Sequence, residues 1–261
     1  MPAMDCRAFE SRMLMPHPSD PRQNRLLAAL PAEDLARLLP FLELVPLEAG
    51  RVLCQAGEPM RFIYFPTDAI VSLLYTIKDG SALEIAVVGN EGIVGLALFM
   101  GGETTLNRAM VQSPGSAYRL KGQLLKTQFD QAGALQQQML RYTQALLTQM
   151  AQRLVCARLH SLDQQFCNWL LQYFERLPNN RLLMTQELIA HLLGVRRGSV
   201  SEVASKLQDA GLIRYHRGSI SLLDRPGLQQ RCCECFGVVK DEFERLFPRD
   251  AHTLLPALLL R

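Results

Sequence analysis

The segment from residue 186 to residue 203 constrains the fold of this chain most, because its side-chain sizes fit two helices joined by a tight turn. Ala190 is small where the second helix must approach closely, and Gly194 falls where the backbone needs a left-handed conformation to turn. The two helices can share one small core, which consists of Ile189, Leu193, Val195, Val200 and Val203. We therefore predict a helix-turn-helix over about residues 185–211.

The second helix of this motif leaves one face free for a ligand. Val200, Val203 and Leu207 have the i, i+3, i+7 spacing that directs one face toward a core. On the opposite face, Arg197 can form a bidentate contact with guanine, and Glu202 can accept a hydrogen bond from cytosine. The same face is predicted to present Gly198, Ser201 and Ser205, with Arg196 and Ser199 near the helix amino terminus, which favours phosphate.

A predicted β-hairpin follows the helix, since residues 213–222 form two short runs around a glycine-containing turn. Its tip residues His216, Arg217 and Ser219 could reach a phosphate backbone. The segment 181–217 contains six basic and three acidic residues, which favours nucleic acid as the ligand. The alternative is a helical hairpin with a solvated basic face; the hairpin and the charge surplus favour duplex DNA.

The segment before the motif changes character twice. Helical spacing between Leu26 and Leu44 predicts short helices, with Pro31 opening one and Pro40 ending it. Residues 124–177 contain no proline and one glycine, Gly133, which predicts long helix. Between these segments, short β-rich runs separated by turn residues predict a small antiparallel β-roll. These runs are 52–53, 62–65, 70–75, 83–88 and 109–111.

One stripe of the long helix is a candidate dimer contact, because its residues are spaced alternately four and three positions apart. The stripe is apolar toward its amino-terminal end and polar toward its carboxyl-terminal end. Pairing with a second copy is one interpretation of the stripe, and packing on the chain's own β-roll is the other. The stripe consists of Leu135, Met139, Tyr142, Leu146, Gln149 and Arg153.

The predicted fold class is therefore α+β, with an N-terminal antiparallel β-roll, flanking helices, a long dimerisation helix and a C-terminal winged helix-turn-helix. A length of 261 residues suits two domains with separate cores. We predict a flexible arm at 1–23, a β-roll sensor domain at 24–123, a dimerisation helix at 124–160, a DNA-binding domain at 161–247 and a tail at 248–261.

This order of elements resembles the CRP/FNR family of bacterial transcription regulators across about residues 24–240, most specifically over 185–222. In that family the β-roll, a double-stranded β-helix, binds an effector, and the long helix forms a parallel dimer. The winged helices read two half-sites of a palindrome. The resemblance implies a homodimer that binds double-stranded DNA, contacts RNA polymerase and is not an enzyme.

The resemblance also assigns roles to single residues. Arg197, Gly198 and Glu202 occupy the positions that read bases in the family. Relatives often have Glu or another polar residue at Gly198 and Arg at Glu202, so the family's best-known operators should not be assumed. The positions that contact phosphates in relatives are Arg196, Ser199, Thr185, Gln186 and His216.

The effector site departs from the family pattern, which has Gly-Glu shortly before Arg-Ser or Arg-Thr. The corresponding segments here are residues 95–99 and 107–109. They retain the arginine, as Arg108, but lack the Glu carboxylate and the Ser or Thr hydroxyl. This argues against cyclic AMP. Arg108 could hold another anion or form a structural ion pair. We take Arg108, Leu96 and Ala109 as candidate contacts for an unknown small molecule.

Seven scattered cysteines, an odd number, predict reduced thiols rather than a disulfide framework. Cys232 and Cys235 form a Cys-x-x-Cys pair, and a thiol- or metal-responsive regulator that uses them is an alternative function. Zinc would need four ligands, with His216 or His252 completing the set, whereas two buried small side chains also explain the pair.

No metal ligand and no cofactor are assigned. An iron–sulfur cluster lacks ligands, because Cys6 is the only cysteine of the arm. Haem needs only one or two axial ligands, which His17, His160 or Cys54 could supply, so a haem cofactor is not excluded. The third alternative is a DNA-binding dimer that needs no effector.

Enzymatic and membrane functions find no support in the sequence. Residues 89–92 contain glycine but lack the Lys and the Ser or Thr of a phosphate-binding loop. No apolar run reaches about 18 residues. The amino terminus carries Asp5, Arg7 and Glu10 instead of a signal peptide, so we expect a cytoplasmic protein.

Overall fold

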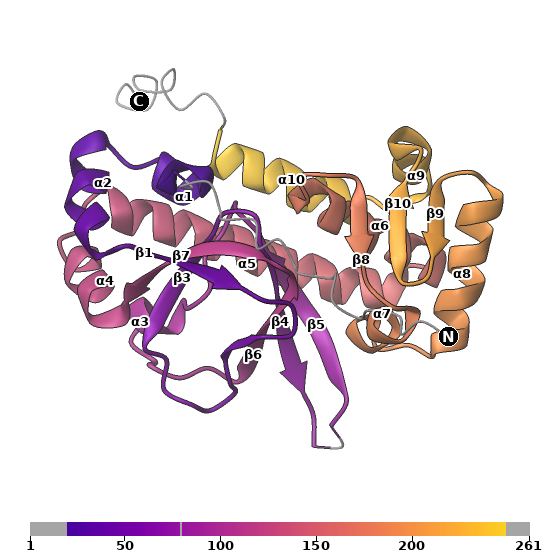
Figure 1. Cartoon of the computed structure of the whole chain (residues 1–261), viewed down its shortest axis with the longest axis horizontal. Helices are drawn as coiled ribbons and strands as arrows, with labels where there is room; N and C mark the ends of the chain where they lie inside the picture. Colours follow the sequence, from indigo (N-terminus) through magenta and orange to yellow (C-terminus); the bar gives the residue numbers. More distant parts are fainter. Residues whose placement is uncertain (1–19, 79, 249–261) are drawn as a thin grey trace, which may run out of the picture.

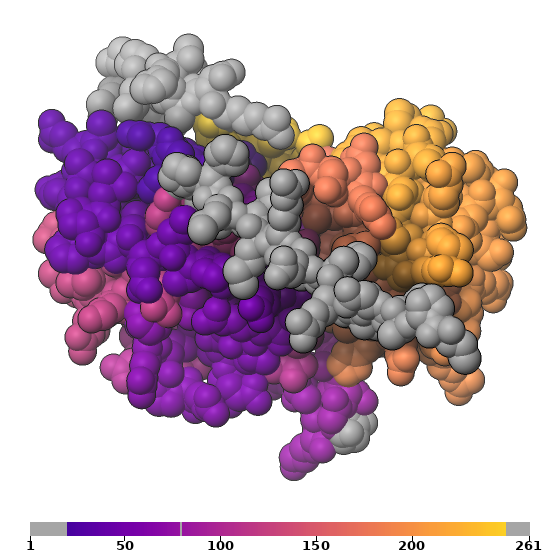
Figure 2. All heavy atoms as spheres, in the orientation of Figure 1, coloured from indigo at the N-terminus to yellow at the C-terminus, as the bar shows by residue number. Residues whose placement is uncertain are grey.

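The computed structural model describes residues 20–78 and 80–248. The predicted arm, apart from residues 20–23, and the tail from residue 249 lie outside this range, as do Cys6, His17 and His252. In Figures 1 and 2 the β-rich N-terminal domain, indigo to magenta, and the helix-turn-helix domain, orange to yellow, occupy opposite ends of the molecule. The predicted α+β class is confirmed.

Short helices open the described chain, as predicted: η1 (Pro21–Gln23), α1 (Arg25–Ala28), α2 (Ala32–Leu38) and η2 (Leu39–Phe41). Asn24 holds them to the roll. Its side-chain oxygen accepts from the amide nitrogens of Leu26 and Leu27 and caps α1. Its Nδ2 donates to the carbonyl oxygens of Pro66 at 3.0 Å and Gly92 at 2.8 Å.

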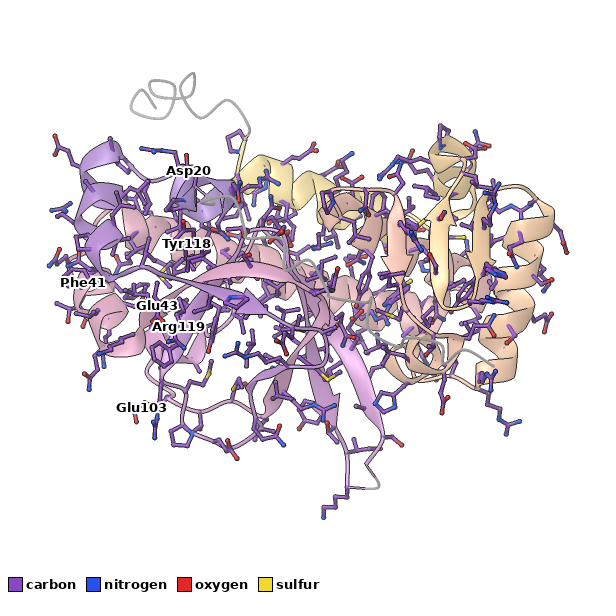
Figure 3. The ribbon with its side chains drawn as sticks, in the orientation of Figure 1. Asp20, Phe41, Glu43, Glu103, Tyr118 and Arg119 are labelled. Carbon is purple, nitrogen blue, oxygen red and sulfur yellow. The ribbon has the colours of Figure 1, made fainter. Side chains whose placement is uncertain are left out.

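Two antiparallel sheets form the β-roll. The predicted runs all lie in strands, and each contributes apolar side chains to the core between the sheets. Two strands of the first sheet, the edge strand β1 and the central strand β7, had not been separately predicted. Arg119 of β7 pairs with Glu43 of β1 at 2.7 Å (Figure 3). The first sheet has the order β1 (Glu43–Leu47), β7 (Gly115–Lys121), β3 (Phe62–Pro66), and the second β2 (Val52–Cys54), β6 (Asn107–Ser113), β4 (Ile70–Thr76), β5 (Ala82–Val88); α3 (Ala97–Met100) precedes β6.

The predicted continuous helix from residue 124 is wrong at its start. The chain forms α4 (Gly122–Phe129), turns, and begins α5 (Ala134–Leu159) after Gly133. Ala132 adopts a φ of 55° in this turn, a left-handed conformation that interrupts a right-handed helix. A second break at residues 160–161 separates α5 from α6 (Leu162–Arg176).

The predicted stripe on α5 packs inside the chain. Leu135, Met139, Tyr142 and Leu146 belong to the β-roll core, so packing on the roll, and not pairing with a second copy, explains the stripe. Gln149 hydrogen-bonds the backbone of Val87. A different face of α5 is exposed and carries Leu140, Leu147 and Leu154, which are 53%, 62% and 73% exposed.

The C-terminal domain has a core of its own around α6 and the helix-turn-helix. Strand β4 joins both cores, since Val71 and Leu73 face the β-roll core while Ile70 and Leu74 face the C-terminal core. The remaining elements are β8 (Arg181–Leu183), α7 (Gln186–Leu193), α8 (Arg197–Asp209), β9 (Ile213–His216), β10 (Ser219–Leu222), α9 (Arg225–Arg231) and α10 (Cys235–Leu246).

The last helix of the described residues, α10, returns to the N-terminal domain. Val239, Phe243 and Leu246 of α10 pack in the β-roll core, and the Phe243 ring lies edge-on to Tyr142 of α5. The helix lies next to α1 and α5 in Figure 1. The DNA-binding domain was predicted to run to residue 247 and so to include α10, but these three side chains of α10 pack against the β-roll instead.

Candidate nucleic-acid interface

The turn between α7 and α8 has the local geometry that the sequence predicts. Thr185 caps α7, its Oγ1 accepting from the amide nitrogen of Leu188 at 3.2 Å. Gly194 ends α7 with a φ of 69°, a conformation that glycine adopts without steric cost. Val195 then donates its backbone N–H to the carbonyl of Ala190 at 2.9 Å. These contacts set the direction in which α8 leaves the turn.

The core of the motif is confirmed. Ile189, Leu193, Val200 and Val203 are buried, and Val195 packs against them. Because these side chains fix one face of α8 against α7, the opposite face is held toward solvent.

The exposed face begins at the amino terminus of α8, where Arg196, Arg197 and Gly198 are all exposed. Space around Gly198 is open: a Cβ built there meets no heavy atom within 4 Å. Ser199 is half-buried. The main-chain N–H groups at the start of α8 lie at the positive end of the helix dipole, which favours an anion.

Two predicted contact residues on α8 already have partners within the chain. Glu202 pairs with Lys206 at 2.8 Å, and this contact lowers the pKa of Glu202 and raises that of Lys206. Ser201 donates its hydroxyl to Oε1 of Gln186 at 2.6 Å. The bond orients the Gln186 amide, whose nitrogen can donate to a group outside the chain.

The wing is the predicted hairpin. Strands β9 and β10 pair in antiparallel register, and the turn residues Arg217 and Gly218 have φ values of 46° and 77°, as in type I′ hairpin turns. His216 and Arg217 are exposed at the tip. The sequence did not predict β8, which pairs with β10 and adds a third strand.

Two side chains hold the wing against the motif. Arg181 of β8 donates its Nε to Oγ of Ser219 at 2.8 Å, so Ser219 is bonded within the sheet. Tyr215 of β9 donates its hydroxyl to the carbonyl of Met184 at 2.7 Å. Burial raises the pKa of Tyr215 to about 12.

Comparisons with known proteins agree with this geometry. Residues 164–231 match the family described as the Crp-like helix-turn-helix domain, and residues 44–132 match the cyclic nucleotide-binding domain family. Both domains occur here in one chain, joined by a long helix. The chain belongs to the CRP/FNR family of transcription regulators.

Solved structures share the fold of this CRP/FNR regulator. A putative regulator of the family from Eubacterium rectale has a TM-score of 0.64 at 15% identity, covering 80% of this chain and 98% of its own. FixK2 from Bradyrhizobium japonicum has a TM-score of 0.65 at 17% identity, with coverages of 74% and 98%. TTHA1359 from Thermus thermophilus has a TM-score of 0.57 at 24% identity, and the match covers 72% of this chain and 97% of its own. No curated protein sequence matches the chain.

The β-roll of the CRP/FNR regulator contains a cavity of 170 Å³ against α5. Leu96 and Ala109, two predicted effector contacts, line it. Arg108 does not line it, because alternation along β6 turns its side chain to the other side of the sheet from Ala109. Nε of Arg108 is buried and has no hydrogen-bond partner. The other lining residues are Cys54, Met60, Leu73, Val94, Gly95, Ala97, Met100, Thr105, Asn107, Thr143, Leu146, Leu147 and Met150.

The cysteines of the regulator are grouped differently from the predicted Cys-x-x-Cys pair. Cys233 and Cys235 lie with Cys156 of α5 and with His160, the residue after α5, whereas Cys232 is not part of this group. Burial raises the pKa of the Cys156 and Cys235 thiols. The i, i+4 spacing of Cys156 and His160 on a helix was the sequence signal for this group, and it was missed. His216, considered as a fourth ligand, lies on the wing instead.

Among the described residues, no helix is long and apolar enough to span a lipid bilayer.

Proposed function

We propose that this regulator acts as a homodimer on a pseudo-palindromic operator and is controlled through its β-roll by a small molecule other than cyclic AMP. The observation that carries the DNA-binding part is the exposed first turn of α8, with Arg197 and Gly198, beside the wing tip at Arg217. A helix presented in this way fits the major groove while the wing lies along the backbone. We place this function in the cytoplasm, with RNA polymerase as a further partner.

Base recognition is assigned to Arg197 and Glu202. Arg197 suits a bidentate contact with guanine. Glu202 suits cytosine, but it must first give up its contact with Lys206, after which Lys206 is free to meet a phosphate. Gly198 lets the DNA approach α8 closely, and Ser201 lies on the same face.

Phosphate contacts are assigned to the residues around this face. Thr185 and Gln186 stand at the amino terminus of α7, where the helix dipole favours a phosphate. The assigned residues are Arg196, Ser199, Thr185, Gln186, His216 and Arg217.

Dimerisation is assigned to the exposed face of α5. Leu140, Leu147 and Leu154 repeat every seven residues, the spacing of a coiled-coil seam. A second copy of α5 would cover these leucines, which otherwise leave a row of apolar side chains in water. The two α8 helices would then read half-sites about 34 Å apart.

Control is assigned to the cavity in the β-roll. Its lining contains no charged side chain, whereas a cyclic phosphate needs a cation. The lining therefore fits an uncharged, largely apolar molecule that contacts Leu96 and Ala109. Leu147 lines the cavity and also belongs to the proposed dimer face, so a bound molecule can act on the pairing of two α5 helices.

The test is enrichment of random duplex DNA by purified protein at near-physiological salt, followed by sequencing. A two-fold symmetric consensus is expected. Arg197→Ala should change it, whereas Arg22→Ala, which removes an exposed arginine of the other domain, should not. A consensus without symmetry would contradict the dimer. If no duplex is enriched with the apo protein or after addition of candidate metabolites, the DNA-binding proposal fails.

A further inference from the structure

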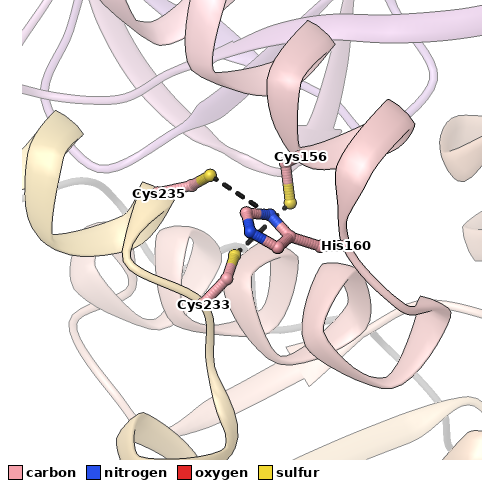
Figure 4. Close-up of side chains that lie close together, drawn as sticks. All are labelled: Cys156, His160, Cys233 and Cys235. Atoms are coloured by element: carbon pink, nitrogen blue, oxygen red, sulfur yellow. Dashed lines mark hydrogen bonds between the residues drawn. The ribbon is translucent and has the colours of Figure 1, made fainter.

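Four metal-binding side chains converge where α5 meets the C-terminal helices (Figure 4). Cys156 and His160 lie one helical turn apart at the end of α5. Cys233 precedes α10 and Cys235 is its first residue. Their ligand atoms all lie within 4.8 Å of one another, although Cys156 and Cys233 are 77 positions apart in the chain.

Two of the six distances between ligand atoms are close to those of a tetrahedral zinc site. Sγ of Cys156 lies 3.5 Å from Sγ of Cys233, and Sγ of Cys235 lies 3.5 Å from Nδ1 of His160. Tetrahedral zinc, with bonds of about 2.3 Å to sulfur and about 2.0 Å to nitrogen, separates two sulfurs by about 3.8 Å and sulfur from nitrogen by about 3.5 Å. The ligand atoms therefore need only small shifts to surround one ion.

Neighbouring groups orient two of the four side chains. The Nε2 of His160 lies 3.3 Å from Oε1 of Glu234, so an Nε2–H would donate to the carboxylate and leave Nδ1 as the ligand. Asn168 donates its Nδ2 to Sγ of Cys156 at 3.4 Å. A carboxylate behind a metal-bound histidine and a hydrogen bond to a ligand sulfur are common in metal sites.

Apolar packing does not account for this arrangement. Cysteines can fill a core as small apolar side chains, and Cys167 does so in the C-terminal core. At the junction, however, Nδ1 of His160 lies 3.5 Å from Sγ of Cys235, and the other ring nitrogen contacts Glu234.

We propose that Cys156, His160, Cys233 and Cys235 form a structural zinc site with three thiolate ligands and one neutral imidazole. All four positions of the ion are filled by the chain, which is typical of structural rather than catalytic zinc. Each thiol releases its proton to solvent as its sulfur binds, so binding releases up to three protons.

The position of the site defines what the ion would hold together. His160 ends α5 and Ser161 caps α6, so the chain bends next to the ligands. Zinc at this point ties the end of α5 to the segment between α9 and α10, and so fixes the C-terminal domain to the long helix. The proposal does not depend on the operator or the effector.

The test is metal analysis of the full chain, purified without a polyhistidine tag and under reducing conditions. About one zinc per chain is expected. Cys233→Ser and Cys156→Ser should lose most of it. Cys232→Ser is the matched control, since it removes an adjacent thiol outside the group, and it should keep its zinc.

Cobalt(II) gives a second measurement that does not rely on the variants folding. Zinc-free wild-type protein titrated with cobalt should show the absorption bands of tetrahedral cobalt with thiolate ligands, and zinc should remove them. The proposal is overturned if wild-type protein incubated with zinc retains none, if Cys233→Ser retains as much as wild type, or if Cys232→Ser loses as much as Cys233→Ser.

Discussion

Trp169 of α6 donates its indole N–H to Oε1 of Glu84 in β5 at 2.8 Å, which joins the DNA-binding domain to the β-roll. Tyr173 donates its hydroxyl to the other oxygen of the same carboxyl group at 2.6 Å, and Ser72 contacts that oxygen too. Glu84 is only 3% exposed. The buried network therefore fixes α6 on the β4–β5 hairpin.

Glu84→Gln should loosen this junction. An amide replaces one acceptor oxygen by a donor, so either Trp169 or the hydroxyls of Tyr173 and Ser72 lose their acceptor, which costs about 1–3 kcal/mol of unfolding free energy. Urea unfolding followed by the fluorescence of Trp169, the only tryptophan, measures the change. Glu33→Gln, at an exposed site on α2, should have no effect. Equal stability of Glu84→Gln and wild type would show that the network contributes nothing.

Arg197→Ala should relax base preference at one position in each half-site and weaken operator binding by about 1–3 kcal/mol. Arg217→Ala should instead weaken binding to all sequences alike and flatten the salt dependence, because the wing is expected to contact phosphate. Competition binding with single-base operator variants over a range of salt concentrations separates the two. Unchanged affinity and preference in Arg197→Ala would refute the proposed docking of α8.

Leu154→Glu should shift the protein from dimer to monomer, because it places a charge in the proposed seam, where Leu154 is 73% exposed. Leu106→Glu changes a leucine of similar exposure, 69%, on the β-roll and should leave the dimer intact. Sedimentation at several protein concentrations measures the mass. A Leu154→Glu protein that remains dimeric would place the interface elsewhere.

Tyr215→Phe should reduce the loss of stability at alkaline pH. The tyrosine pKa is about 10 in an unfolded chain and about 12 in the folded protein. Between these values the unfolded state loses the proton first, so rising pH favours unfolding. Unfolding free energies measured from pH 9 to about 12 should therefore fall more steeply for wild type than for Tyr215→Phe, so that the two proteins become closer in stability as the pH rises. Tyr75→Phe changes an exposed ring and should show the same pH dependence as wild type. If Tyr215→Phe also shows the wild-type pH dependence, the raised pKa of Tyr215 is contradicted.

Glu234→Gln should weaken zinc binding about tenfold, since a residue behind a metal ligand contributes about 10–100-fold to affinity and Glu234 is largely exposed. Competition with a chromogenic chelator gives this value. Zinc at a thousandfold excess over Kd should raise the unfolding free energy of wild type by about 4 kcal/mol. Cys233→Ser should show no such rise, and a zinc-independent wild type would contradict a structural role.

The helix-turn-helix could be predicted from sequence because its determinants are local. Gly194 supplies the turn, Val200 and Val203 share a face at helical spacing, and the strands of the wing meet across a short turn. These relations hold within a few residues, so the amino-acid order alone specifies which side of α8 is free.

Tertiary structure decided the rest. Periodicity grouped Leu135, Met139 and Tyr142 on one face of the long helix, but it could not say that the β-roll covers that face and leaves Leu147 exposed. The side of the sheet on which Arg108 lies depends on strand register. The meeting of Cys156 with Cys233 depends on the return of α10, because residues distant in the chain become neighbours only when separate elements pack together.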